Sequence, residues 1–200
     1  DLGLDQYEET VMSISGQASK ELSIEESLQT IENTWATTNL EIAPYKDRGH
    51  FILRGTDEIY QLLEDNQVTL STMKASRFVK AFETQVDFWE RALSTLLEVV
   101  ELILVVQRQW MYLENIFLGE DIRKQLPQES NQFDEINQKF KSIMTKLNKD
   151  PNAQRGAHTP DLPKTLSSMN TILEHIQKSL DMYLETKRQL FPRFYFVSND

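Results

Sequence analysis

Histidines and paired carboxylates are the residues of this chain that could carry acid–base or metal chemistry. The three histidines are His50, His158 and His175. None of them has an acidic or histidine partner at the spacing that zinc or di-iron sites use. Carboxylate pairs such as Glu25-Glu26 and Asp134-Glu135 fall on the polar faces of expected helices, where solvated charge is the usual role.

Two other common sources of chemistry are missing from the sequence. It contains no cysteine, which excludes disulfides, thiolate metal sites and cysteine nucleophiles. It contains no Gly-rich phosphate-binding loop, and Gly55-Thr-Asp57 is interpreted as a helix cap. We therefore predict that the chain by itself is not an enzyme and has no catalytic, cofactor-binding or metal-binding residues.

Composition argues against two classes of binding partner, nucleic acids and membranes. The 200 residues carry a formal net charge of −10, which argues against nucleic acid because phosphates would repel such a surface. The most apolar stretch, 96–106, is too short to span a membrane and contains Glu98 and Glu101. These two carboxylates either pair with a base on a neighbouring helix or lie on a solvent-facing side. Isolated bases such as Arg108 and Arg123 could meet an acidic partner, although bases on helices are usually solvated.

The elements that would position these residues are mostly helical. Helices are predicted over 5–38 with a possible break at Gly16, and over 57–73, 76–118, 129–148 and 164–189. The predicted helix 76–118 is the longest, roughly 60 Å at about 1.5 Å per residue, with Gly119 as its C-cap. Its apolar residues alternate steps of four and three, which predicts a continuous heptad-like seam: Phe82, Val86, Trp89, Leu93, Leu96, Val100 and Ile103.

The same spacing predicts the buried stripes of the other helices. These are Ile24, Leu28, Ile31 and Trp35 in the first, Phe133, Ile136, Phe140, Ile143 and Leu147 in the fourth, and Leu166, Met169, Leu173, Ile176, Leu180 and Tyr183 in the last. Core packing is the expected role of the three tryptophans, Trp35, Trp89 and Trp110, and an exposed anchor for a binding partner is the alternative.

Two segments depart from helical spacing. Alternation over 40–44, turn residues over 46–49 and a β-prone run over 50–53 predict a β-hairpin with Pro44 on an edge strand. Three prolines and Gly156 predict one long loop over 149–163. The fold class is therefore all-α, an elongated helical bundle with one long central helix and a small β-hairpin.

The final segment is strongly aromatic. Its motif is Phe191, Pro192, Arg193, Phe194, Tyr195 and Phe196, directly after the last predicted helix. Each large aromatic side chain would bury on the order of 150–250 Å² in a core or interface. We expect this segment to pack against something further, and the chain to be excised from a larger protein.

Several ordered runs together resemble the linker region of dynein heavy chains. They are Val106-Gln-Arg-Gln-Trp-Met-Tyr-Leu-Glu-Asn-Ile-Phe117, Asp121-Ile-Arg-Lys-Gln-Leu-Pro127 followed by Phe133, and Leu184-Glu-Thr-Lys-Arg188 leading into the aromatic motif. Shorter pieces upstream occur in the same order as in that family: Trp35 before the hairpin, Asp57-Glu-Ile59 and Trp89-Glu90. The family-motif core on this resemblance is Trp89, Trp110, Leu113, Phe117, Pro127 and Phe133. The ending Val-Ser-Asn-Asp200 is similar to that of axonemal heavy chains, and an inner-arm heavy chain is the finer interpretation.

The resemblance implies a function and a set of partners. Residues 1–200 would form the C-terminal part of the linker, with 190–200 as the junction to the first AAA+ module. The implied role is a noncatalytic lever that bends and straightens across the AAA+ ring. Implied partners are the AAA+ modules in cis and, indirectly, other dynein subunits, with microtubules reached only through a distant stalk. The implied location is cytoplasmic and cytoskeletal, in a ciliary or flagellar axoneme.

Bending would have to concentrate at discontinuities of the helices. The candidates are the hairpin, the 119–127 break and the 149–163 loop, with Gly119, Pro127 and Gly156 as candidate flexible residues. We expect the break over 120–127 to be mobile relative to the long helix. The alternative to a lever is a standalone helical scaffold that binds partner helices along its seam.

Overall fold

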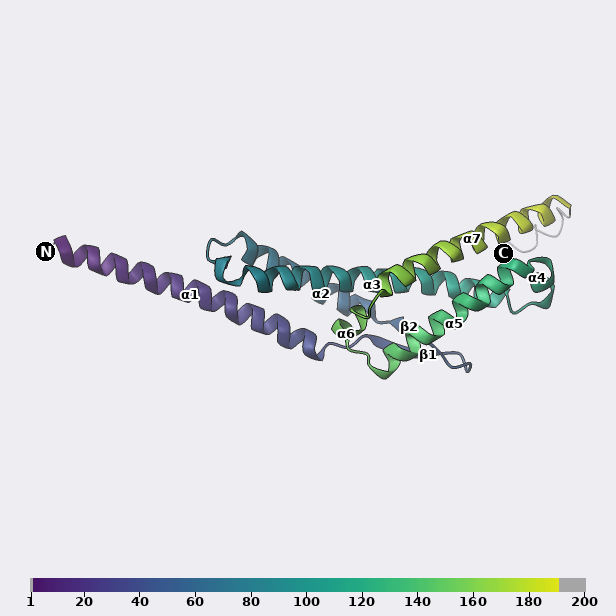
Figure 1. Cartoon of the computed structure of the whole chain (residues 1–200), viewed down its shortest axis with the longest axis horizontal. Coiled ribbons are helices and arrows are strands. Elements are labelled where there is room, and N and C mark those ends of the chain that lie inside the picture. Colours follow the sequence, from purple (N-terminus) through teal and green to yellow (C-terminus); the bar gives the residue numbers. More distant parts are fainter. Residues whose placement is uncertain (1, 191–200) are drawn as a thin grey trace. The chain divides into compact units, whose positions relative to one another are not determined.

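The computed structural model describes residues 2–190, with side chains from residue 16 onward (Figure 1). The chain divides into two compact units. The first unit comprises Asp1–Glu41, Gly55–Leu97 and Pro151–Thr159, and the second comprises Ile42–Arg54, Glu98–Asp150 and Pro160–Asp200. The aromatic motif at 191–196 lies outside the described residues. The predicted fold class is confirmed, because the described residues form helices and one two-stranded sheet.

The first unit is built from helices that bury apolar stripes against one another. It contains α1 (Leu2–Thr37), α2 (Thr56–Ala75), the 3₁₀ turn η1 (Val79–Phe82), the first part of α3 (Glu83–Ile116) and the short helix α6 (Ala153–Ala157). α1 contacts α2, η1 and α6. Its predicted stripe is confirmed: Ile24, Leu28, Ile31 and Trp35 are all buried. The predicted break at Gly16 does not occur, since α1 continues through it.

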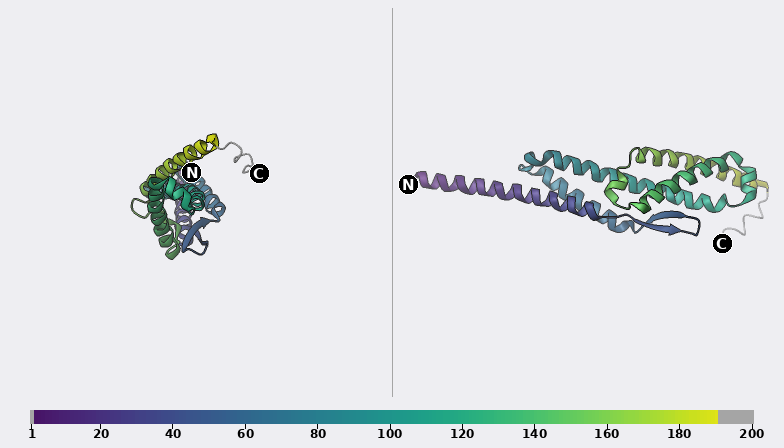
Figure 2. Two further views of the ribbon diagram at one scale, coloured as in Figure 1. Left: turned by 90° about the vertical axis from the view of Figure 1, so that its right-hand side faces the viewer. Right: turned by 60° about the horizontal axis from the view of Figure 1, so that its bottom comes forward.

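The second unit combines the hairpin with three longer helical segments and the short helix α4. It contains β1 (Glu41–Tyr45), β2 (His50–Arg54), the rest of α3, α4 (Glu120–Gln125), α5 (Pro127–Lys149) and α7 (Leu162–Leu190). The first residue of β1, Glu41, is assigned to the first unit. α5 packs on both β2 and α7 (Figure 2). The predicted stripes of α5 and α7 are buried except at two positions, where Ile143 and Tyr183 are half-buried. Met144 occupies the core beside Ile143, because a helix of 3.6 residues per turn drifts from a strict pattern.

The start of the predicted 76–118 helix is wrong. α3 begins only at Glu83, and Ser76 has an extended backbone, with φ −76° and ψ 137°. The Ser76 hydroxyl accepts a hydrogen bond from the Phe78 N–H at 3.2 Å. Such local side-chain bonding competes with helical hydrogen bonding, so the chain turns through η1 first. α3 spans 34 residues and α1 spans 36, so the predicted longest helix is not the longest.

Two further details of the prediction need correction. Gly119 has φ −74° and ψ 129°, so it is an extended N-cap of α4 and not a left-handed C-cap of α3. The stretch predicted as a loop contains α6, in which Ala153, Gly156 and Ala157 are buried. Small side chains let this short helix lie against its neighbours, which a count of prolines and glycines does not reveal.

Gly55 explains how the hairpin passes into α2. It is the N-cap of α2 with φ 60°, in the left-handed region that side chains disfavour. A Cβ at this position would also collide with the Glu41 carboxylate. The interpretation of Gly55-Thr-Asp57 as a cap is confirmed. Its backbone makes the cap, and Asp57 and Glu58 in the first turn complement the helix dipole.

Candidate functional site

The most specific polar contact of the second unit joins the hairpin to α3. The Gln107 side chain accepts a hydrogen bond from the Leu53 N–H at 2.7 Å and donates one to the Leu53 carbonyl at 2.9 Å. Gln107 is 7% exposed and Leu53 is 2% exposed. The amide thus imitates a neighbouring strand and satisfies both backbone groups of a buried residue. This pairing sets where β2 lies along α3.

Trp110, one helical turn further along α3, is the centre of an aromatic cluster. Its ring is fully buried and lies 5.4 Å from Tyr45, 5.0 Å from His50 and 5.1 Å from Phe140, measured between ring centroids. The indole N–H donates to Asn137 Oδ1 at 2.8 Å, so its polar atom is satisfied. β1, β2, α3 and α5 therefore meet at one side chain.

Glu114 holds the tip of the hairpin. It is 5% exposed, and its two oxygens accept from Lys46 Nζ at 3.4 Å and Arg48 Nη1 at 3.2 Å. Lys46 also donates to Asn115 Oδ1 at 2.8 Å. A carboxylate this buried requires compensating charge, and the two turn bases supply it from the solvent side.

The charges around the hairpin also act on His50. Burial is the largest cause lowering the pKa of His50 below its ordinary value of 6.5. Lys141 and Arg48 lower the pKa further, while Glu114 raises it. The ring therefore packs on Trp110 as a neutral imidazole near neutral pH.

Arg123 bridges the two sides of the break between α3 and α5. Its Nε donates to the Phe117 carbonyl at 2.6 Å, and its guanidinium makes two hydrogen bonds to Asp134 at 3.0 and 2.9 Å. Hydrogen bonding to Asp134 is the largest cause raising the pKa of Arg123 above its ordinary value. Phe117 also stacks on Phe133, with centroids 5.2 Å apart. Arg123 therefore makes specific contacts although its side chain is 40% exposed.

Asn152 makes the comparable junction in the first unit. Its amide nitrogen donates to the carbonyls of Trp35 and Ala36 at 3.4 and 3.1 Å, near the end of α1. Its Oδ1 accepts from the Arg155 N–H at 2.9 Å, as the N-cap of α6. Backbone bonds from Leu40 to Pro151 and from Ala153 to Thr38 flank it. One side chain thus ends one helix and starts another.

The residues chosen from the sequence occupy different environments. Trp110, Leu113, Phe117 and Phe133 are buried, whereas Trp89 is half-buried and Pro127, at the start of α5, is exposed. Gly119 is exposed and Gly156 is buried. Glu98 and Glu101 are both exposed, so they lie on the solvent-facing side of α3.

Sequence reasoning missed Gln107, Glu114 and Asn152. For the first two a signal existed. The alternating steps of the α3 seam continue past Ile103 to Gln107, Trp110, Glu114 and Phe117. A polar residue at a seam position predicts a buried hydrogen-bonding role. Asn152 carried no such signal, because its partners are more than a hundred residues away in the chain.

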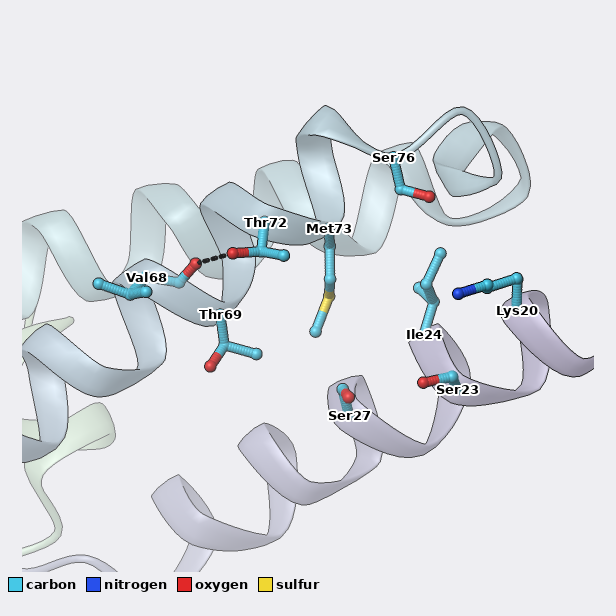
Figure 3. Close-up of a pocket in the computed structure, with 9 residues that line it drawn as sticks. All are labelled: Lys20, Ser23, Ile24, Ser27, Val68, Thr69, Thr72, Met73 and Ser76. Atoms are coloured by element: carbon cyan, nitrogen blue, oxygen red, sulfur yellow. Dashed lines mark hydrogen bonds between the residues drawn. The ribbon is translucent and has the colours of Figure 1, made fainter.

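The first unit has several surface hollows. One of about 320 Å³ lies between α1 and α2, with Ile24 and Met73 pointing into it from the two helices (Figure 3). The hydroxyls of Thr69 and Thr72 are engaged with carbonyls of their own helix, at Asp65 and Val68. Among the side chains that the structure describes, no three His, Asp or Glu residues gather as a metal site. No helix within 2–190 is long and apolar enough to cross a membrane.

These contacts define a helical structural module in which polar side chains join helices to one another. Comparison with known proteins gives its family. Residues 1–200 match the model of the dynein heavy chain, N-terminal region 2. The chain belongs to the dynein heavy chain family.

Its relatives are axonemal and flagellar heavy chains. The chain is 68% identical over 200 residues to human dynein axonemal heavy chain 2, and 51% identical over 200 residues to the Chlamydomonas reinhardtii dynein-1-beta heavy chain of the flagellar inner arm I1 complex. Human dynein axonemal heavy chain 6 is 43% identical over 195 residues, or 97% of this chain. The first two matches cover all of this chain, which spans about 4% of the length of those relatives.

Proposed function

We propose that this chain is the C-terminal part of the linker of an axonemal dynein heavy chain. In this role it is a noncatalytic lever that bends and straightens across an AAA+ ring and converts the state of the ATPase into movement. Its partners are the AAA+ modules of the same heavy chain, with 190–200 as the junction, and indirectly other dynein subunits. Its location is then the ciliary or flagellar axoneme.

The single observation that carries the proposal, beside family membership, is the seam of α3. One uninterrupted 34-residue helix presents buried residues along its length, from Val86 through Leu96 and Ile103 to Leu113. Packed side chains resist graded deformation, so a helix held in this way transmits displacement. Gln107, Glu114 and Trp110 add specific contacts from this helix to the hairpin and α5.

The test makes the proposed lever more flexible by an insertion in a complete dynein heavy chain. A short Gly-Ser insertion between Leu118 and Gly119, both exposed, lengthens the connection between α3 and α4. A lever with this insertion should hydrolyse ATP nearly as fast as the parent but move microtubules severalfold more slowly. Microtubule gliding and microtubule-stimulated ATP hydrolysis measure the two quantities.

The matched control replaces the exposed Leu118 by Ser and leaves the length of the connection between α3 and α4 unchanged. It should leave gliding close to the parent. Unchanged gliding with the insertion at Leu118 would contradict the lever and favour a standalone scaffold. Sequencing of the parent gene beyond Asp200 adds a separate check, since the proposal requires an AAA+ module with a phosphate-binding loop there.

A further inference from the structure

A groove in the first unit is lined by α1 and the beginning of α3. Its volume is about 440 Å³. The α1 side contributes Glu25, Leu28 and Glu32, and the α3 side contributes Gln85, Phe88 and Trp89. Leu28 is fully part of the core, so the groove has an apolar floor with carboxylates along one wall.

The α3 wall exposes aromatic surface. Phe88 is 57% exposed and Trp89 is half-buried, whereas Trp35 and Trp110 are fully buried. The Phe88 and Trp89 rings form an edge-to-face pair with centroids 5.4 Å apart. Aromatic residues are enriched at the centres of protein interfaces, where their large area supplies binding energy. This pair is therefore suited to contact a partner.

The α1 wall is acidic and has no base among its lining residues. Glu25 and Glu32 are exposed and two helical turns apart on one face of α1, a separation of about 10 Å along the axis. Leu22, three residues before Glu25 on the same face, is 53% exposed and extends the apolar surface. The nearby base Lys74 is engaged with Asp87 and Glu90 at 3.7 and 3.5 Å.

We propose that this groove binds a basic amphipathic helix of a protein partner. An apolar side chain of that helix packs on Phe88 and Trp89, and two Lys or Arg residues two turns apart pair with Glu25 and Glu32. Charge complementarity selects this occupant, because the two carboxylates would attract a basic helix and repel an acidic one. A second copy of this chain is disfavoured on the same ground, since each copy carries a net charge of −10. The inference goes beyond the lever and does not require it.

The probe is a synthetic alanine-rich helix with one leucine midway between two lysines placed seven residues apart, matching the spacing of the two carboxylates. Binding to the full 200-residue chain is followed by acrylamide quenching of tryptophan fluorescence. Since Trp35 and Trp110 are fully buried, protection from quenching reports on Trp89. We expect saturable binding that shields Trp89.

Two double variants with equal net charge separate the groove from general attraction. Glu25→Gln with Glu32→Gln should weaken binding roughly tenfold. Glu98→Gln with Glu101→Gln, which changes exposed residues further along α3, should leave affinity unchanged. Circular dichroism and thermal melting verify that both variants fold as the parent does. Phe88→Ala should weaken binding severalfold without a change in fold.

Three results would overturn the proposal. The first is the absence of saturable binding by the folded parent chain. The second is equal weakening by both double variants, which would mean general charge attraction. The third is Trp89 already shielded without peptide in a chain that sediments as a dimer, which would make a second copy the occupant.

Discussion

Gln107 and Leu53 exchange two hydrogen bonds in which a side-chain amide pairs with both backbone groups of a buried strand residue. Substitution Gln107→Leu keeps the approximate volume but leaves the Leu53 N–H and carbonyl without this partner. We expect the free energy of unfolding to fall by about 2–4 kcal/mol, since each buried unsatisfied group costs about 1–3 kcal/mol. Urea denaturation measures it. Gln128→Leu, at an exposed position of α5, is the control, and an equal loss there would contradict the pairing's importance.

The Arg123 bridge predicts that the break over 120–127 is held to its neighbours. Arg123→Lys preserves charge but cannot make two parallel bonds to Asp134 while also reaching the Phe117 carbonyl. Because the pair is partly solvated, the stability loss should be modest, about 1 kcal/mol or less. The sharper readout is amide hydrogen exchange, which should quicken over 117–126.

Arg108→Lys is the matched control for this bridge, because Arg108 is exposed on α3. It should leave exchange unchanged. If the parent already exchanges over 120–127 as fast as a free peptide, the bridge does not restrain the break and the original expectation of mobility holds.

Asn152 tests whether one side chain can end one helix and begin another. Asn152→Asp retains the oxygen that accepts from the Arg155 N–H but places negative charge against the carbonyls of Trp35 and Ala36. The loss of stability should be about 2 kcal/mol and should exceed that of Asn131→Asp at an exposed site. Calorimetric melting measures both, and equal melting temperatures would show that the donor contacts contribute nothing.

His50 gives the chain a pH dependence of known sign. Its pKa is lower in the fold than the ordinary 6.5, so below pH 6.5 the unfolded chain binds a proton that the folded chain resists. Stability therefore declines as pH falls below 6.5, because the native ring lies against Trp110 and near Lys141. His50→Phe, which keeps an aromatic ring, should reduce the difference in melting temperature between pH 7.5 and pH 5.5. An unchanged difference would assign the pH dependence to carboxylates instead.

The sequence by itself determined the longer helices, the hairpin and most of the apolar lining of the cores. Periodicity decides which face of a helix is apolar, and burial follows from the free energy of removing that face from water. This is why the stripe ending at Trp35 and the seam through Leu96 were predictable. Turn chemistry likewise identified the hairpin and the cap at Gly55.

Only the tertiary structure decided which polar residues join distant elements. Gln107 meets Leu53 across 54 positions, and Asn152 meets Ala36 across 116, so no local pattern links them. The structure also decided that Trp89 keeps exposed surface beside Phe88 while Trp35 and Trp110 do not. Periodicity gives the direction of a side chain around its own helix. Whether that side chain is buried or exposed depends on which other elements pack against that face.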